Sequence, residues 1–230
     1  MKVIHIEAKL KSEVLLPEKI IKSLPEKLVV FTTIQFINSL PGIIKQLQSA
    51  GKKPFVVKTN HSRHEGQLLG CNIESHKTYT DKQFDAFLYI GDGLFHPKAL
   101  AWKNEEKKVF SYNPFTGTFS EIKSEDTEQI KKKHKAALSK FFISKKIGVL
   151  VTTKPGQFML KKALKLKEQY PEKEFFFFLD NTYNFHSLED FPFIDSWVNT
   201  ACPRIGFDDS ISLSKAIINI DDVIKINKTN

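Results

Sequence analysis

The chain contains the same pattern twice, and this internal repeat limits the folds that it can adopt. A short run rich in β-branched residues ends in Thr-Thr and is followed by Gln-Phe, once as LVVFTTIQF (residues 28–36) and again as GVLVTTKPGQF (residues 148–158). Each copy continues into apolar residues at helical spacing and then into two further apolar runs. These runs are PFVVKT and DAFLYIGDG in the first half, and EFFFFLD and IDSWVNTACP in the second.

This order of strand, helix, strand and strand predicts two similar α/β units, each with a small parallel sheet. Continuous apolar runs are typical of strands that are buried on both faces of such a sheet. We place the boundary before an amphipathic helix that starts near Asp126, so the units cover residues 1–124 and 125–230. Before it, KKVFSYNPFTGTFSEI predicts two strands joined by an Asn-Pro turn. We expect an additional edge strand at VIHIEAKL and a short helix in EVLLPEKIIKSL.

The charge pattern argues against a nucleic-acid-binding or membrane protein. The formal net charge is +9, but the lysines are scattered and no nucleic-acid-binding motif is present. The densest basic run, KKKHK, lies in a segment with helical periodicity, which predicts a solvent-exposed helix face. The apolar positions of that helix are Ile130, Ala137, Leu138, Phe141 and Phe142. No apolar run approaches the roughly 18 residues that a membrane-spanning helix needs, and the N-terminus does not resemble a signal peptide, so we expect a cytoplasmic protein.

Residues able to bind a ligand follow the predicted strands. In open α/β sheets, binding sites form beyond the carboxyl ends of the strands. We expect the two units to direct these ends toward a common cleft between them. The candidates are Thr32, Thr33 and Gln35 after the first strand, Gly91, Asp92 and Gly93 after DAFLYI, Thr152, Thr153, Lys154 and Gly156 after the second Thr-Thr strand, and Cys71, Cys202 and Arg204 in loops.

The cysteines and arginines of this chain occur together. Cys71 and Cys202 are the only two cysteines, and the only two arginines are Arg63, shortly before Cys71, and Arg204, just after Cys202. A guanidinium group is a planar donor that suits carboxylates and phosphates. Because two distant cysteines do not make a disulfide framework, we interpret them as candidates for metal binding or chemistry.

Each of these signals also has a purely structural explanation. A single cysteine is often a buried apolar residue, Asp92 between two glycines can mark a tight turn, and Thr-Thr after a strand can cap a helix. His61 and His64 have the spacing of two metal ligands, but no second ligand pair of recognisable spacing accompanies them. His96 can bind a ligand or make a structural hydrogen bond.

Taken together, the motifs TTIQ, GQLLGC, YIGDGLFHP, NPFTG, TTKPGQ and NTACPRIGFDD resemble those of the diphthamide synthase family in order and approximate spacing. These are the 2-(3-amino-3-carboxypropyl)histidine synthases of archaea and eukaryotes. The resemblance implies three similar α/β domains around a cleft, each giving one cysteine to a [4Fe–4S] cluster whose open iron binds S-adenosylmethionine. It further implies transfer of a 3-amino-3-carboxypropyl group, by radical chemistry, to one histidine of elongation factor 2.

The resemblance also implies roles for single residues. Cys71 in GQLLGC and Cys202 in ACPR correspond to the second and third cluster cysteines, and thiolates are the usual ligands of such clusters. Arg204 is expected to favour the ionised thiol or to bind the carboxylate of S-adenosylmethionine. Glycines let the backbone approach this cofactor closely because they lack Cβ. The other expected cofactor contacts are Thr32, Thr33, Gln35, Gly91, Asp92, Gly93 and Thr153.

The resemblance covers only the family's second and third domains, because VIHIEAKL resembles the first strand of the second domain. Two cysteines cannot supply three cluster ligands. We expect a separate chain to supply the first domain and the third cysteine, and Met1 directly before a predicted strand favours a natural start. The alternatives are a homo-oligomer with an unusual cluster, a non-catalytic accessory subunit that binds a paralogue, and a relic or truncated protein. A small-molecule-binding α/β module without a cluster stays open as a different class.

Overall fold

The computed structural model describes residues 4, 6–72, 75–78, 80–123, 125–207 and 214–226. The chain divides into two compact units, Met1–Thr127 and Glu128–Asn230, which are described here one at a time. The division falls in the first turn of α4 (Glu125–Ile143), the helix at whose start the sequence placed the boundary. None of the helices in the described ranges has the length and apolar character that crossing a bilayer requires.

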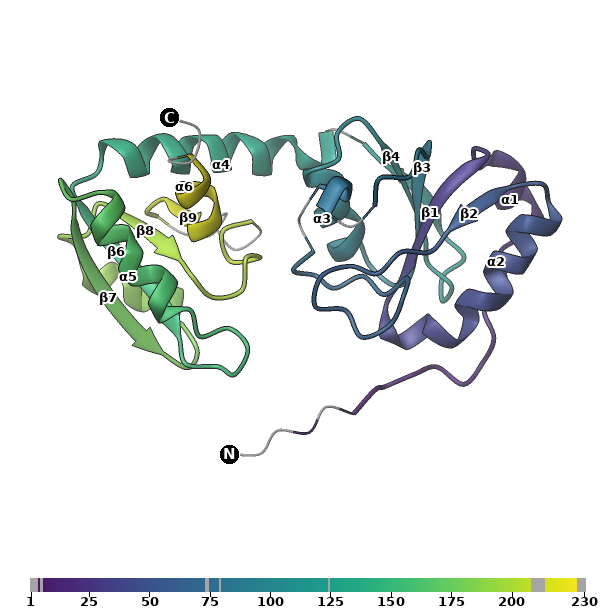
Figure 1. Cartoon of the computed structure of the whole chain (residues 1–230), viewed down its shortest axis with the longest axis horizontal. Coiled ribbons are helices and arrows are strands. Elements are labelled where there is room, and N and C mark those ends of the chain that lie inside the picture. The colour runs from purple at the N-terminus through teal and green to yellow at the C-terminus, as the bar shows by residue number, and fades with distance from the viewer. Residues whose placement is uncertain are drawn as a thin grey trace. The chain divides into compact units, whose positions relative to one another are not determined.

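The first unit is a five-stranded sheet with helices packed against it (Figure 1). The strand order is β2-β1-β3-β4-β5, in which the first four strands are parallel and β5 is antiparallel to β4. The predicted α/β architecture is confirmed. The elements are α1 (Glu18–Ser23), β1 (Lys27–Thr32), η1 (Ile34–Ser39), α2 (Leu40–Ser49), β2 (Lys53–Phe55), η2 (His76–Thr78), β3 (Ala86–Ile90), α3 (Phe95–Trp102), β4 (Lys108–Tyr112) and β5 (Phe119–Ile122).

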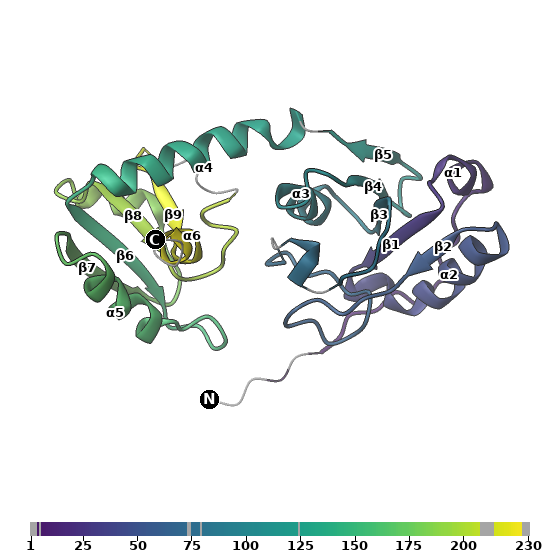
Figure 2. The same cartoon turned by 45° about the horizontal axis from the view of Figure 1, so that its top comes forward.

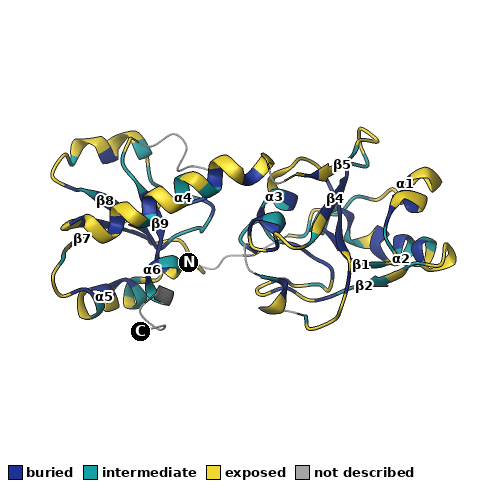
Figure 3. Ribbon diagram, turned by 90° about the horizontal axis from the view of Figure 1, so that it is seen from above, coloured by how far each residue is buried: buried dark blue, intermediate teal, exposed yellow. Residues whose placement is uncertain are grey.

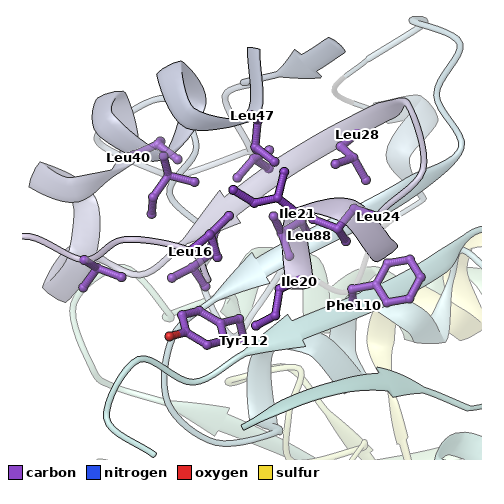
Figure 4. Close-up of a cluster of buried hydrophobic side chains, with 14 of the residues drawn as sticks. Leu16, Ile20, Ile21, Leu24, Leu28, Leu40, Leu47, Leu88, Phe110 and Tyr112 are labelled. Atoms are coloured by element: carbon purple, nitrogen blue, oxygen red, sulfur yellow. The ribbon is translucent and has the colours of Figure 1, made fainter. Parts of the chain in front are cut away.

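Alternate residues of β1 bury opposite faces of this sheet, because successive strand side chains point to opposite sides. Leu28 and Val30 pack in one cluster with the apolar side chains of α1 and α2, and Val29 and Phe31 pack in another with Leu100 of α3. Figure 4 shows the first cluster, in which leucines and isoleucines of the two helices point toward β1, β3 and β4. Helices therefore cover both faces of the sheet. A ligand-binding site is accordingly expected at the strand ends.

The second unit repeats the design with four parallel strands in the order β7-β6-β8-β9. Figures 1 and 2 show α5 lying along β6 and β7. After α4 (Glu125–Ile143), the elements are β6 (Lys146–Thr152), α5 (Leu160–Gln169), β7 (Glu174–Asp180), η3 (Phe185–Asp190), β8 (Ser196–Asn199), β9 (Ile217–Asn219) and α6 (Ile220–Ile226).

Two apolar clusters lie on the two faces of this second sheet. Val149 and Val151 of β6 pack with Phe141 of α4, while Leu150 and Trp197 pack on the other face beneath η3 and its flanking loop. Strands β1, β3, β4, β6, β8 and β9 are largely buried, whereas β2, β5 and β7 are buried only in part. Most of the exposed residues lie on loops and on the outer sides of helices (Figure 3).

Three details of the expected fold are wrong. VIHIEAKL forms no strand in its described part, residues 4 and 6–10; Ile6 is 90% exposed there, and the segment is held by polar contacts instead. The strand predicted at PFVVKT ends at Phe55, and residues 56–59 continue without regular secondary structure into the loop that carries Cys71. Phe142 is 42% exposed although its periodicity suggested burial, since Phe141 takes the inward position at the end of α4.

Candidate cofactor site

The candidate residues of the first unit gather at the carboxyl ends of β1, β3 and β4. Thr32 and Ile90 occupy the same register on adjacent parallel strands, and the Thr32 hydroxyl donates a hydrogen bond to the Ile90 carbonyl at 2.7 Å. Gly91 follows directly and donates its N–H to the carbonyl of Tyr112 at 3.0 Å. Thr32 is therefore fully buried, and its hydroxyl connects the carboxyl ends of β1 and β3.

The loop that carries Cys71 is attached to the end of β1. Thr32 donates its N–H to the Gly66 carbonyl at 2.8 Å, and its own carbonyl accepts from the Leu68 N–H at 2.8 Å. These bonds form an isolated parallel bridge between Thr32 and Gln67. The GQLLGC motif thus begins as a one-residue extension of the sheet, which brings half-buried Cys71 to the same sheet edge as the Thr-Thr and Gly-Asp-Gly motifs.

Asn72, directly after Cys71, closes this loop. Its Oδ1 accepts hydrogen bonds from the Leu69 N–H at 2.8 Å and from the Thr59 hydroxyl at 2.9 Å, and its Nδ2 donates to the Asn60 carbonyl at 3.0 Å. The residue is only 2% exposed. A buried amide with these partners is costly to move, because displacing it leaves buried polar groups unsatisfied.

Aromatic residues of α3 and β3 flank the same loop. A Cβ on Gly70 would come within 2.2 Å of the Phe95 ring, so only glycine lets Phe95 pack against the residue before Cys71. The Tyr89 hydroxyl lies 3.2 Å from Nδ1 of His96, with the two rings stacked. Burial, together with the charge of Asp92, raises the pKa of Tyr89 far above its usual range, so the phenol stays protonated at neutral pH.

The N-terminal segment contacts the turn that precedes GQLLGC. A carboxylate oxygen of Glu7 lies 2.7 Å from Nε2 of His64 and 3.2 Å from a guanidinium nitrogen of Arg63, and its other oxygen is 2.8 Å from the Lys9 ammonium. Hydrogen bonds from Lys9 and His64 lower the pKa of Glu7 to about 2. Arg63 therefore faces a carboxylate of its own chain. Among the described residues no group of three or more His, Cys, Asp and Glu could hold a metal ion.

Cys202 lies in a short loop directly after β8. Thr200 still follows the strand, with its N–H and hydroxyl donating to the Leu150 carbonyl at 3.0 and 2.8 Å. The Cys202 carbonyl accepts two hydrogen bonds, from Nδ2 of Asn199 at 2.9 Å and from the Ile205 N–H at 3.0 Å. Half-buried Cys202 is thus held through its own peptide group, three residues beyond the strand end.

Arg204 is buried beside this cysteine. It is 5% exposed, and its guanidinium carbon lies 4.4 Å from the centroid of the Phe207 ring. The arrangement is a cation–π contact that places the guanidinium over the Phe207 ring. The two arginines that the sequence paired with the cysteines therefore differ, because the Arg63 side chain is 69% exposed.

The remaining predicted contacts occupy strand ends of their own units. Thr33 follows β1, and its hydroxyl is buried without a hydrogen-bond partner in the described part of the chain. Gln35 is half-buried, Asp92 and Gly93 are exposed after β3, and Thr153 is exposed after β6. Thr32, Thr33, Gly91 and the Cys71 loop therefore meet at one sheet edge, whereas Thr153 and Arg204 belong to the second unit. The predicted common cleft would be formed by both units together, and it stays a prediction.

Sequence reasoning missed the residues that hold the cysteine loops. Asn72 and Asn199 lie within or beside the cysteine motifs, and a search for buried amides next to each thiol could have found them. Asn219 and Glu7 are far from the cysteines in sequence, and no local signal marks them.

These features agree with comparisons to known proteins. The family model for diphthamide synthesis proteins (Diphthamide_syn) matches residues 1–224. The chain belongs to this family. It is 35% identical over 207 residues to the 2-(3-amino-3-carboxypropyl)histidine synthase of Pyrococcus horikoshii, and 31% identical over 190 residues to subunit 1 of the corresponding synthase of Schizosaccharomyces pombe. These matches include 88% and 79% of the present chain.

Solved structures of the family have the same fold. The crystal structure of Dph2 from Pyrococcus horikoshii with a 4Fe-4S cluster superposes with a TM-score of 0.76 at 32% identity and covers 89% of this chain. The present chain spans only 58% of that protein's length, and 42% of the Schizosaccharomyces pombe subunit. Family membership therefore rests on the whole chain, while the relatives contain a further region that these matches do not include.

This chain has the kind of side chain that binds an iron–sulfur cluster, but it has fewer cysteines than a cluster held by three cysteines needs. Cys71 and Cys202 are half-buried thiols on hydrogen-bonded loops at sheet edges, and thiolates are the usual ligands of such clusters. The chain has only these two cysteines. A cluster held by three cysteines needs a third thiolate from another source.

Proposed function

We propose that this chain carries out the first step of diphthamide biosynthesis as one part of a 2-(3-amino-3-carboxypropyl)histidine synthase. One observation carries the proposal. Each unit bears one half-buried cysteine at the carboxyl edge of its parallel sheet, in a chain 32% identical to a Dph2 that was solved with a 4Fe-4S cluster. Cys71 and Cys202 are proposed as two ligands of a common [4Fe–4S] cluster. A separate chain that carries the family's first domain supplies the third.

The proposed reaction is balanced without a stoichiometric oxidant or reductant. The carbon–sulfur bond to the aminocarboxypropyl group of S-adenosylmethionine breaks, and a bond forms from that carbon to the imidazole ring of one histidine in elongation factor 2. Methylthioadenosine leaves, and one ring proton is released. When bound and reduced, a [4Fe–4S] cluster supplies a catalytic electron for the cleavage, which is returned when the ring proton is lost.

The side chains of this protein act by binding and orientation. Arg204 is proposed to pair with the carboxylate of S-adenosylmethionine, because its guanidinium already lies over the Phe207 ring and a guanidinium matches a carboxylate bidentately. Thr33 has a buried hydroxyl that makes no hydrogen bond to the described residues, so it is proposed to bond to the cofactor. Gly91 and Gly93 present backbone without Cβ, and Asp92 is an exposed acceptor. Thr32 acts indirectly, because its hydroxyl already ties β1 to β3.

Anaerobic reconstitution with iron, sulfide and reductant tests the proposal. The chain is prepared alone and together with a chain that carries the family's first domain, each with wild-type cysteines, Cys71→Ser or Cys202→Ser. We expect about four irons per wild-type complex and transfer of the labelled aminocarboxypropyl group to elongation factor 2. We expect little iron in the lone chain, and loss of both iron and transfer in each serine variant.

Three results would contradict specific parts of the proposal. Stable binding of four irons and transfer activity by the lone chain would refute the requirement for a separate chain. Complexes that form with the partner but stay colourless and iron-free would refute the cluster, and would favour an accessory subunit or a ligand-binding module. Retained iron in one serine variant would show that the cysteine replaced in that variant is no ligand.

A further inference from the structure

Two asparagines at the ends of adjacent strands form a hydrogen-bonded pair beneath the Cys202 loop. Asn199 ends β8 and Asn219 ends β9, and they occupy the same register of the parallel pair. The Asn199 Nδ2 donates to Oδ1 of Asn219 at 2.7 Å. Both residues are buried, at 1% and 6% exposure. We name these two side chains the amide pair.

Each member of the amide pair also binds the backbone of the cysteine loop. Asn199 donates from Nδ2 to the Cys202 carbonyl at 2.9 Å and accepts at Oδ1 from the Ala201 N–H at 3.0 Å. Asn219 donates from Nδ2 to the Pro203 carbonyl at 2.8 Å. The Ala201 N–H and the carbonyls of Cys202 and Pro203 are thereby bonded to side chains at the strand ends.

The loop sequence is suited to this contact. A Cβ on Gly206 would come within 2.6 Å of Oδ1 of Asn219, so a side chain at position 206 would displace the amide pair. Pro203 restricts the backbone of the preceding Cys202 to extended conformations. Both features of the ACPRIG segment limit the conformations available to the thiol.

We propose that the amide pair is a positioning device that holds Cys202 in its ligating conformation before any metal binds. The loop is then ordered by folding, so metal binding loses little additional conformational entropy of the loop backbone. Asn199 and Asn219 are positioning residues, since neither contributes a thiolate. That Cys202 is a cluster ligand rests on the proposed function, but the positioning of its thiol by the amide pair can be measured without a cluster.

The first test is the alkylation rate of each cysteine in the full, cluster-free chain. Iodoacetamide labelling followed by peptide mass spectrometry gives both rates in one sample. Asn219→Ala removes the hydrogen bond from Asn199 and the one to the Pro203 carbonyl. We expect it to raise the Cys202 rate at least about tenfold and to leave the Cys71 rate unchanged. Gly206→Ala should act in the same direction by displacing Asn219. Asn184→Ala is the matched control, because the side chain of this exposed asparagine of the second unit accepts a hydrogen bond from the nearby His186 N–H at 3.1 Å and lies outside the Cys202 loop.

The second test compares the electron paramagnetic resonance spectrum of the reduced cluster in complexes of wild-type and variant chains with the first-domain chain. A broadened or shifted spectrum in Asn219→Ala and Gly206→Ala, at unchanged secondary structure, is expected from misplaced Cys202. If the proposed function fails, the wild-type complex gives no such spectrum, while the alkylation rates still report on positioning.

An unchanged Cys202 rate in a folded Asn219→Ala chain would overturn the proposal. If that variant does not fold, an unchanged Cys202 rate in Gly206→Ala overturns it equally. Equal acceleration of Cys71 and Cys202 would also overturn it, because that result indicates general loosening of the chain.

Discussion

The two cysteine loops use different means to reach similar positions. Cys71 lies in a long connection between β2 and β3, far from its preceding strand end, and depends on three attachments: the Thr32–Gln67 bridge, the Asn72 amide and the Glu7 ion pairs. Cys202 follows β8 by three residues and is held by neutral amides on strand ends. Cys71, which is farther from its strand end, therefore depends on more separate contacts than Cys202 does.

The two loops also differ in charge. The attachment of the first loop includes a carboxylate, a guanidinium and an imidazole near the surface. The Cys202 attachment consists of buried amides and backbone groups, which do not titrate in the ordinary pH range. Low pH is therefore expected to distinguish the two loops, whereas loss of packing is expected to affect each unit separately.

The largest expected effect is a packing loss confined to one unit. Trp197 is 1% exposed, with its ring centroid 4.9 Å from that of Phe178, and Trp197→Ala should destabilise the second unit by about 3–5 kcal/mol. Pulsed alkylation during a urea titration should then detect Cys202 at lower urea than Cys71. Trp102→Ala in α3 is the matched variant and should expose Cys71 first. Simultaneous exposure of both thiols in every variant would show that the units unfold together.

Removal of the Asn72 amide should loosen only the first loop. Asn72→Ala leaves the Leu69 N–H and the Asn60 carbonyl without this partner, which costs about 2–3 kcal/mol. We expect faster alkylation of Cys71 at an unchanged Cys202 rate, the mirror image of Asn219→Ala. Asn113→Ala, which removes an amide from the β4–β5 turn, serves as the control. A slow, wild-type Cys71 rate in Asn72→Ala would mean that the Thr32–Gln67 bridge holds the loop without Asn72.

The two arginines should respond unequally to the same conservative change. Arg204→Lys loses a buried guanidinium stacked on Phe207 and should cost about 1–2 kcal/mol of unfolding free energy. Arg63→Lys, at a mostly exposed ion pair, should change it by less than about 0.5 kcal/mol. Titration with S-adenosylmethionine adds a functional readout, in which weaker binding is expected for Arg204→Lys alone. Unchanged affinity in that variant would exclude the proposed carboxylate contact.

The smallest expected effect is the pH response of the first loop. Because the pKa of Glu7 is lowered from 4.5 to about 2, its ion pairs stabilise the folded chain above pH 4.5 and are lost as the pH falls toward 2. Hydrogen exchange of the peptide around Arg63 and His64, corrected for intrinsic rates, should show declining protection in this range. Glu7→Gln should remove the decline, and peptides around Cys202 should not share it. Parallel declines in both loops would instead indicate global acid unfolding.

Much of the fold could be predicted from the sequence because its signals are local. The β-branched and aromatic runs formed strands, apolar periodicity gave α2, α4 and α5, and the Asn-Pro turn joined β4 to β5 as expected. VIHIEAKL shows where this reasoning fails. Its alternation suits a strand, but a strand needs a neighbour with unpaired backbone groups, and residues 6–10 contact side chains of the Cys71 loop and the carbonyl of Gln35 instead.

The family, the two α/β units and the two thiols could be predicted from motif order and periodicity, because these signals are present along the chain. Tertiary structure alone decided what holds those thiols. Asn219 reaches the Cys202 loop only because β9 pairs with β8 in register, and Glu7 reaches His64 across more than fifty intervening residues. Such contacts depend on how strands align and loops close, and that information is not contained in any short segment.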